Sequence, residues 1–253
     1  MKVVLDIKKN VEQNAGSYFT LARKLRKKLA GAQAALASSQ RRLQQMQEEQ
    51  PKKQAAQSQR KREWYEKFRW FLSSDGFLCV GGRDATSNDI IIKKHAEKGD
   101  VIFHTNLAGS PFFIVKNGES APPATIQEAA DATFIYSRAW KLGLSAAEVF
   151  SAKPEQLSKT PQSGEYVPKG AFVVRGKTGS HIPRADCAVG ILPDKRIMGG
   201  PPAAVRKNCT ASIVLERGNE KTAAIAKYIR KKLGGELDDL IKVIPAGGVR
   251  VKK

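Results

Sequence analysis

The chain has 253 residues, enough for one or two domains, and its 27% charged and 41% hydrophobic residues are ordinary for a globular protein and exclude wholesale disorder. Its charge is unusual, because 44 Lys and Arg against 24 Asp and Glu give a formal net charge of +20. This excess favours a polyanionic partner, nucleic acid ahead of an anionic membrane surface. No apolar run is long enough to span a membrane and no signal peptide is evident, so we expect a soluble, cytoplasmic protein that does not bind a membrane.

The cysteines and histidines form no metal-binding or disulfide pattern. Three cysteines lie far apart, never as CxxC, and three histidines stand singly. They are Cys79, Cys187 and Cys209, and His95, His104 and His181. We therefore expect no metal, no cofactor and no disulfide framework.

The first 70 residues are strongly basic and have a helical pattern. They hold 17 Lys and Arg but only 6 Asp and Glu. No proline occurs between Asn14 and Glu49, which predicts one long helix. Its apolar and small residues recur every three or four positions, in the a/d register of a coiled coil. These residues are Leu25, Leu29, Ala32, Leu36, Ser39, Leu43 and Met46.

A second helix is predicted after a turn at Pro51, over Lys52 to Phe71. Its Trp64, Phe68 and Phe71 would share one apolar face. The two helices together predict a basic antiparallel coiled-coil hairpin over residues 1–71. The alternative is a long helix that bundles with its own domain, and the high charge density argues against it because little could be buried.

From residue 72 the pattern changes to short apolar segments broken by Gly and Pro. Strands are predicted at Phe77–Gly81, Val101–Thr105, Phe112–Lys116, Ala171–Arg175, Cys187–Leu192 and Ala211–Glu216. Helices are predicted at Asp84–His95, Pro123–Leu142 and Asn219–Leu233. These elements predict one α+β domain over residues 72–253, a mixed sheet with flanking helices.

Three segments contain residue types found in enzyme sites. Gly176–Thr178 matches the end of a phosphate-binding loop, but Gly170 is one position too far upstream and no helix is predicted to follow. Ser180–His181 with Asp186 has the residue types of a triad without a GxSxG elbow. His104, near a strand end, suits phosphate binding or acid–base work, although a structural histidine is the commoner case. We predict no catalytic residue.

Basic residues beside glycines carry a stronger signal, because glycine lets the backbone approach a ligand. Arg83 follows Gly82, which is predicted to need a close approach or a positive φ, at a strand-to-helix junction whose free N–H groups would add to an anion site. Such cations pair with phosphates without reading sequence. The predicted RNA-binding residues are Arg23, Lys24, Arg26, Lys27, Lys28, Arg83, His104, Lys169, Arg175 and Lys177.

Segments spread over nearly the whole chain resemble the NFACT protein family. Lys67–Phe77 (KFRWFLSSDGF), followed by Gly81–Ala85 (GGRDA), is similar to the start of the family's NFACT-R domain. Lys159–Lys177 resembles the second signature of that domain, and Val4–Asp6 with the helix after it resembles the start of the family's coiled coil. One departure is Asn106, two residues after His104, where relatives tend to carry an acid.

The resemblance implies binding to the large ribosomal subunit that carries a stalled peptidyl-tRNA, in ribosome-associated quality control. Family members there promote C-terminal tailing of the nascent chain. The implied partners are large-subunit ribosomal RNA and tRNA. The family's N-terminal NFACT domain and helix-hairpin-helix segment have no counterpart in these residues, so we do not expect tailing by this chain alone.

Two other functions remain open. The first is a protein-interaction adaptor, in which the coil and Trp64, Phe68 and Trp70 hold a separate NFACT N-terminal half or another quality-control partner. The second is an RNA-processing enzyme built around His104. Salt separates RNA binding from the adaptor function, because the affinity of a contact with phosphates falls steeply as salt rises and that of an apolar coil interface does not. Turnover of RNA would reveal the enzyme.

Overall fold

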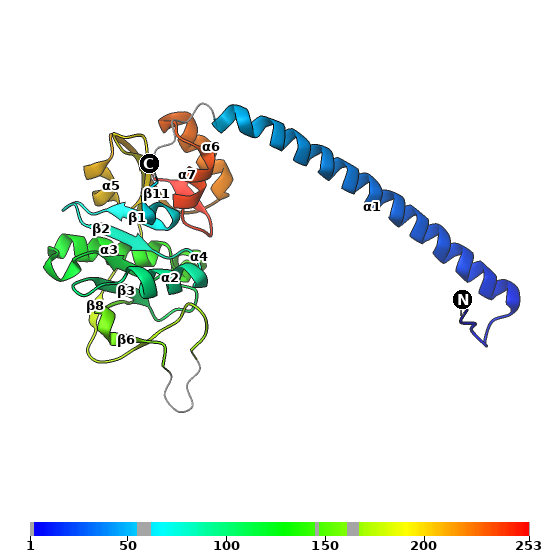
Figure 1. The fold of residues 1–253 in the computed structure, drawn as a ribbon, viewed down its shortest axis with the longest axis horizontal. Helices are drawn as coiled ribbons and strands as arrows, with labels where there is room; N and C mark the ends of the chain where they lie inside the picture. Colours follow the sequence, from blue (N-terminus) through cyan, green and yellow to red (C-terminus); the bar gives the residue numbers. More distant parts are fainter. Residues whose placement is uncertain (1–2, 55–61, 145–146, 161–166, 253) are drawn as a thin grey trace. The chain divides into compact units, whose positions relative to one another are not determined.

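The computed structural model describes residues 3–54, 62–144, 147–160 and 167–252, and the chain divides into two compact units, Met1–Arg62 and Glu63–Lys253. The first unit is built on α1 (Val11–Gln54), a single helix of 44 residues (Figure 1). Asn10 caps it, because its Oδ1 accepts from the backbone N–H of Gln13 at 2.8 Å. The predicted long N-terminal helix is confirmed.

The predicted turn of the hairpin at Pro51 is wrong. α1 continues through Pro51 to Gln54. The fixed φ of proline fits a helix, so Pro51 removes one backbone hydrogen bond without forcing the chain to turn back. Residues 55–61 of the predicted second arm lie outside the described residues.

The end of the predicted second arm belongs to the globular unit instead. Trp64–Lys67 form a 3-10 helix, η1, and Arg69–Leu72 form strand β1. Phe68 and Phe71 therefore enter different apolar clusters and do not share a helix face. The boundary between the units accordingly lies after Arg62 rather than at residue 71.

The second unit is α+β, with strands in three sheets. After β1 the strands are β2 (Leu78–Gly81), β3 (Val101–Thr105), β4 (Phe113–Val115), β5 (Val149–Ala152), β6 (Leu157–Ser158), β7 (Val173–Val174), β8 (Gly179–His181), β9 (Cys187–Ile191), β10 (Ile197–Gly200), β11 (Ala211–Glu220) and β12 (Val249–Val251). Their orders are β1-β2-β4-β3-β5-β8, β10-β9-β11-β12 and β6-β7. Every strand pair in the described part of the chain is antiparallel, so the predicted mixed sheet is wrong. Short turns such as the one between β1 and β2 permit only antiparallel neighbours.

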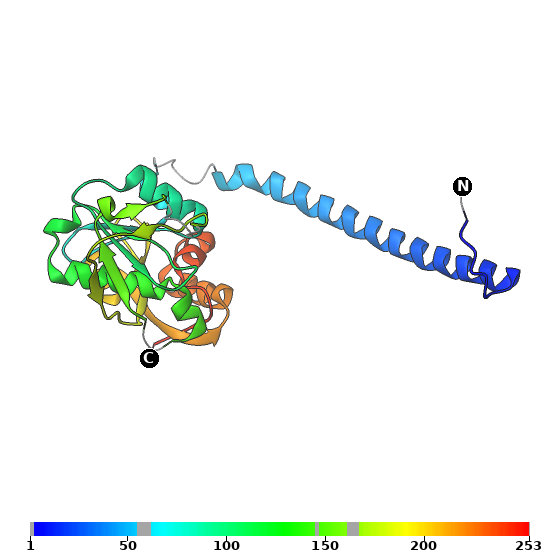
Figure 2. The same cartoon turned by 90° about the horizontal axis from the view of Figure 1, so that it is seen from below.

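The helices of this unit flank the sheets, as predicted. They are α2 (Ala85–His95), α3 (Pro123–Ile135), α4 (Arg138–Leu142), α5 (Pro202–Asn208), α6 (Thr222–Leu233) and α7 (Leu237–Val243), with 3-10 turns η2 (Gly118–Ser120) and η3 (Pro154–Gln156). The helix predicted over residues 123–142 is divided, because Ser137 caps a new helix by accepting from the N–H of Ala139 at 3.0 Å. α6 and α7 pack side by side (orange and red in Figure 2).

The six-stranded sheet is buried on both faces. Along β3 and β4, Phe103 and Phe113 face the larger apolar cluster, which also contains α3 and the four-stranded sheet. Their neighbours Ile102 and Ile114 face a smaller cluster with Ile91 of α2. This double burial explains why these strands are nearly continuous apolar runs, and it places α2 against the sheet.

No described helix is long and apolar enough to cross a membrane. Within the described ranges, no group of three or more His, Cys, Asp or Glu could hold a metal ion. The cysteines are unpaired, and burial raises the pKa of Cys187 to about 12 and that of Cys209 to about 11. At neutral pH these thiols are therefore protonated and unreactive.

Candidate nucleic-acid interface

β2 leads into α2 through Gly81 and Gly82, where a side chain cannot fit. A Cβ on Gly81 would lie 2.3 Å from the Phe113 ring, and one on Gly82 would lie 1.8 Å from Oδ1 of Asn88. Asn88 is buried and accepts from the backbone N–H of Phe112 at 3.1 Å. The predicted close approach at Gly82 is confirmed, and neither glycine has a positive φ.

The prediction of free backbone N–H groups at this junction is wrong for Gly82, Arg83 and Asp84, because all three groups donate hydrogen bonds within the protein. The first donates to the carbonyl of Phe112 at 3.0 Å, and the other two donate to Oγ of Ser87 at 2.7 and 2.9 Å. Asp84 caps α2, and the bond it accepts from the Ser87 N–H at 2.8 Å lowers the pKa of its carboxyl. A carboxylate therefore occupies the helix N-terminus, which leaves the Arg83 side chain to hold an anion.

Arg83 is an exposed cation, and no ion pair within 4 Å joins it to an acid in the described part of the chain. The two nearest candidates in sequence are engaged elsewhere. Asp84 caps α2, and Asp89 binds Lys159 at 2.9 Å and Lys93 at 3.9 Å. The guanidinium of Arg83 is therefore available to a phosphate.

Lys169 lies next to the same end of α2, although it is far from Arg83 in sequence. Gly170, with φ +79°, donates its N–H to Oδ1 of Asp89 at 3.1 Å, and a Cβ there would lie 2.5 Å from Cα of Ala85. Lys169 itself is exposed. The fold thus brings two predicted cations, Arg83 and Lys169, to one surface around the first turn of α2.

Arg175 and Lys177 lie beyond the other end of β7. Their turn closes around Gln156, whose Nε2 donates to the carbonyls of both residues at 2.9 and 2.8 Å. The guanidinium of Arg175 donates to the carbonyl of Thr160 at 3.1 Å, whereas Lys177 is exposed. The Gly176–Thr178 segment leads into strand β8 and opens no helix, which argues against a phosphate-binding loop.

His104 is held inside the six-stranded sheet. Its Nδ1 donates to the carbonyl of Pro111 at 2.8 Å, since a carbonyl can only accept. Its ring stacks on Phe112 with centroids 3.9 Å apart and packs edge-on against Phe150. Burial lowers the pKa of His104, partly offset by the bond to Pro111, so the imidazole is neutral at pH 7. These contacts favour a role in holding the loop after β3 over a charged contact with RNA.

Replacing His104 with Ala should lower stability by about 1–3 kcal/mol, because the stacking and the bond to Pro111 are lost. A folded-state pKa below the unfolded value means that the histidine supports folding above the unfolded pKa and loses that contribution as pH falls through the folded value. Thermal unfolding between pH 7.5 and 5 should therefore show less acid destabilisation in His104→Ala than in the unaltered chain.

The same variant tests whether His104 is catalytic. Incubation of both proteins with ribosomal RNA and tRNA should give no product, and cleavage or modification only by the unaltered chain would contradict this account.

α1 carries the second group of predicted cations. Arg23, Lys24, Arg26, Lys27 and Lys28 are all exposed, and no ion pair joins any of them to a residue within the described ranges. At about 100° per residue these five encircle the helix. They form a cationic surface that helix-internal pairing does not neutralise.

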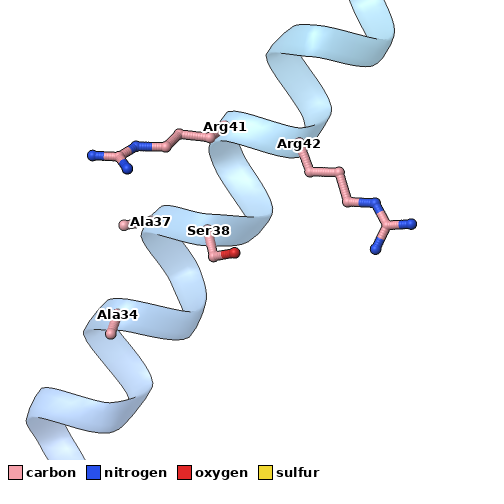
Figure 3. A pocket seen from close by; sticks show the side chains of 5 residues that line it. All are labelled: Ala34, Ala37, Ser38, Arg41 and Arg42. Carbon is pink, nitrogen blue, oxygen red and sulfur yellow. The ribbon is translucent and has the colours of Figure 1, made fainter.

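Sequence reasoning did not include two further arginines of α1. Figure 3 shows Arg41 and Arg42 extending from opposite sides of the helix, next to Ala34, Ala37 and Ser38. The five residues line a shallow open depression on one helix rather than an enclosed cavity. The signal that could have identified them in the sequence is the Arg-Arg pair after a run of small residues.

α1 also has an exposed apolar stripe. Leu25, Leu29, Leu36 and Leu43, all in the predicted a/d register, are 54–61% exposed. No residue of the first unit within the described ranges covers this stripe. A helix with such a stripe normally packs against a second helix.

Comparison with known proteins identifies the globular unit. Residues 67–176 match the family described as "NFACT protein RNA binding domain". The chain is 37% identical over 205 residues to "Archaeal Rqc2 homolog aRqcH" of Methanocaldococcus jannaschii, a match that covers 77% of this chain and 30% of that protein. It is 36% identical over 172 residues to "Ribosome quality control complex subunit NEMF" of Homo sapiens, covering 65% of this chain and 16% of that protein.

The match extends to fungi, with 33% identity over 184 residues to "Ribosome quality control complex subunit 2" of Schizosaccharomyces pombe, covering 69% of this chain and 18% of that protein. The chain thus spans less than a third of the length of these relatives. The matched range includes Arg83, His104, Lys169 and Arg175. The chain therefore belongs to the NFACT family and corresponds to a C-terminal part of it that contains the NFACT-R domain.

Proposed function

We propose that the chain is an RNA-binding component of ribosome quality control that binds ribosomal RNA of the large subunit beside a stalled peptidyl-tRNA. The observation that carries the proposal is the pair of exposed cations, Arg83 and Lys169, which the fold gathers at one end of α2 inside the range matched to an RNA-binding domain. Its relatives named as ribosome quality control subunits support the ribosomal setting.

Binding in this proposal is electrostatic and does not depend on base sequence. Arg83, Lys169 and Lys177 are exposed on loops and contact phosphates, while the backbone donors at the α2 N-terminus are already engaged. The cations of α1 add a second set of phosphate contacts, on ribosomal RNA or tRNA. Each neutralised phosphate releases counterions, so affinity falls steeply with salt.

Replacing Arg83 with Ala should weaken RNA binding by about 1–3 kcal/mol, because one charge-assisted contact is lost. The melting temperature should stay near that of the unaltered chain, since no ion pair in the described ranges depends on Arg83. Fluorescence anisotropy with labelled ribosomal RNA fragments measures the affinity. Arg206→Ala, which removes an exposed arginine from the last turn of α5, is the matched control and should bind normally. Unfolding of Arg83→Ala, or unchanged affinity, would contradict the assigned role.

A second candidate function is that of a protein-interaction adaptor, and the exposed leucine stripe of α1 favours it. In this reading the stripe holds a helix of a separate NFACT N-terminal chain or of another quality-control partner. Such binding would bury apolar surface and tolerate salt, unlike RNA binding. The two functions are compatible, because cations surround the helix while the leucines follow one side.

In this function the chain binds RNA without performing a chemical step. It acts in the cytoplasm, with its ribosomal partners. His104 has its Nδ1 engaged by Pro111, and its nearby loop offers Thr105 and Ser110, whose hydroxyls bond each other at 2.6 Å. General acid–base catalysis needs a second group in hydrogen-bond reach of the reacting atoms. The contacts of His104 with Pro111, Phe112 and Phe150 are structural ones.

A further inference from the structure

α6 presents a basic face that lies outside residues 67–176, the range matched to the RNA-binding domain. Between residues 221 and 232 the chain has five cations and no acid. They are Lys221, Lys227, Arg230, Lys231 and Lys232, and all are exposed.

The apolar side of α6 determines which residues face outward. Ile225 and Ile229 are 2% and 0% exposed, and the helix packs against β11, β12 and α7. At about 100° per residue, Lys227 and Lys231 are about 40° apart on the opposite side, and Tyr228 is about 60° from Lys231. Tyr228 is 43% exposed, so its ring is accessible from outside.

Helix stability alone does not account for this set of charges. Cations in the last turn stabilise a helix through its dipole, which explains Arg230, Lys231 and Lys232. Lys227 lies outside the last turn, and Lys221 is at the N-cap, where a cation is unfavourable. Two of the five charges therefore need another explanation.

Three cations that follow α6 in the chain are paired, and those of α6 are not. Lys242 binds Asp239 at 2.7 Å, and Arg250 binds Glu216 at 2.7 Å. Lys252 binds Asp186 at 2.6 Å. By contrast, no ion pair joins the α6 cations to any residue in the described part of the chain. The α6 charges therefore remain available to an external polyanion.

We propose that the α6 face, made of Lys227, Tyr228 and Lys231, binds single-stranded RNA. The two lysines contact neighbouring phosphates while Tyr228 stacks on an unpaired base. An exposed ring beside cations suits a single strand, because the bases of a duplex are not free to stack on it. Ala223 and Ala224 are exposed on the same side and leave room for the strand. This inference rests on the proposed RNA-binding function and adds to it a further site, on α6, with a preference for unpaired RNA.

The test measures binding of a labelled 12-nucleotide single-stranded RNA, and of a duplex hairpin, by fluorescence anisotropy over a range of KCl concentrations. Lys227→Gln/Lys231→Gln should weaken single-strand binding about tenfold and reduce the salt slope by about 1.4, at about 0.7 for each phosphate contact. Tyr228→Leu should weaken it about fivefold or more while leaving the salt slope unchanged. Arg250→Gln/Lys252→Gln removes the same charge from paired residues and should leave both quantities near those of the unaltered chain.

The outcomes separate this inference from the proposed function. Failure of the unaltered chain to bind any RNA would overturn both. Normal binding by the two α6 variants, together with loss in Arg83→Ala, would overturn the α6 site alone and leave the face for an acidic protein. Equal loss of duplex binding, with no effect of Tyr228→Leu, would overturn the single-strand preference. Melting temperatures within about 2 °C of the unaltered chain show that each variant is folded.

Discussion

Reversing the charge of the five basic residues of α1 should abolish binding to RNA and to the large ribosomal subunit at moderate salt. Five cations become five anions, so phosphate contacts are lost and like-charge repulsion replaces them. The residues are Arg23, Lys24, Arg26, Lys27 and Lys28. All are exposed, and Glu is a good helix former, so α1 should remain helical.

Filter binding and circular dichroism together check this prediction. The matched control replaces the same five residues with Gln, which removes the charge without adding repulsion and should give an intermediate affinity. Unchanged binding by the charge-reversed chain, with α1 still helical, would show that α1 is no cationic arm. It would favour the leucine stripe, and hence a protein partner, as the function of this helix.

Replacing Arg196 with Ala should destabilise the globular unit by about 2–4 kcal/mol. This is the largest loss of stability that we expect from replacing a single charged residue. Arg196 joins the β9–β10 turn to the chain that precedes β1. Its guanidinium lies 2.6 Å from Asp194, 3.0 Å from the hydroxyl of Tyr65 and 3.7 Å from Glu66. It also stacks over the ring of Trp70 at 4.9 Å, and only 19% of its side chain is exposed.

Thermal unfolding should show this as a fall in melting temperature of about 5–15 °C for a unit of this size. Arg250→Ala is the control, because its pair with Glu216 is more exposed, at 62% and 29% of the two side chains, and is worth about 0–1 kcal/mol. Equal effects of the two variants would contradict the claim that Arg196 ties the N-terminal part of the unit to its second sheet.

Continuous apolar strands could be predicted from the sequence because burial on both faces leaves a clear signal. The segment Val101–Thr105 is a strand with the predicted bounds, and Cys187–Ile191 differs from its prediction by one residue. β10, by contrast, carries the sequence IMGG and was not predicted. A Cβ on Gly199 would lie 2.6 Å from Cβ of Val243, so glycine is needed for packing, a requirement that only the tertiary structure reveals.

The candidate site was predictable in its residue types and less so in its chemistry. Arg83 and Lys169 are proposed as RNA contacts from their glycine neighbours, but only the fold reveals that Gly170 packs on Ala85 and brings them together. The sequence also could not show that Ser87 engages the N–H groups of Arg83 and Asp84. The sequence contains the same serine whether its hydroxyl accepts these hydrogen bonds or remains free.

The prediction of a second helical arm was wrong for a related reason. Trp64, Phe68 and Phe71 have helical spacing, and aromatic residues serve strands equally well. Pairing of Phe71 with Cys79 on β2 outweighs helix formation there, since it places the ring in the core. Tertiary packing of this kind is not encoded in local periodicity.

Co-sedimentation of the unaltered chain with purified large ribosomal subunits at about 50 and 200 mM KCl is the most direct test of RNA binding through phosphate neutralisation. If six to ten phosphates are contacted, affinity should fall by about 10³- to 10⁵-fold between the two salt concentrations. Subunits stripped of peptidyl-tRNA should bind less of the chain than stalled ones at the lower salt. Binding that does not change with salt, or its absence at both concentrations, would contradict the account.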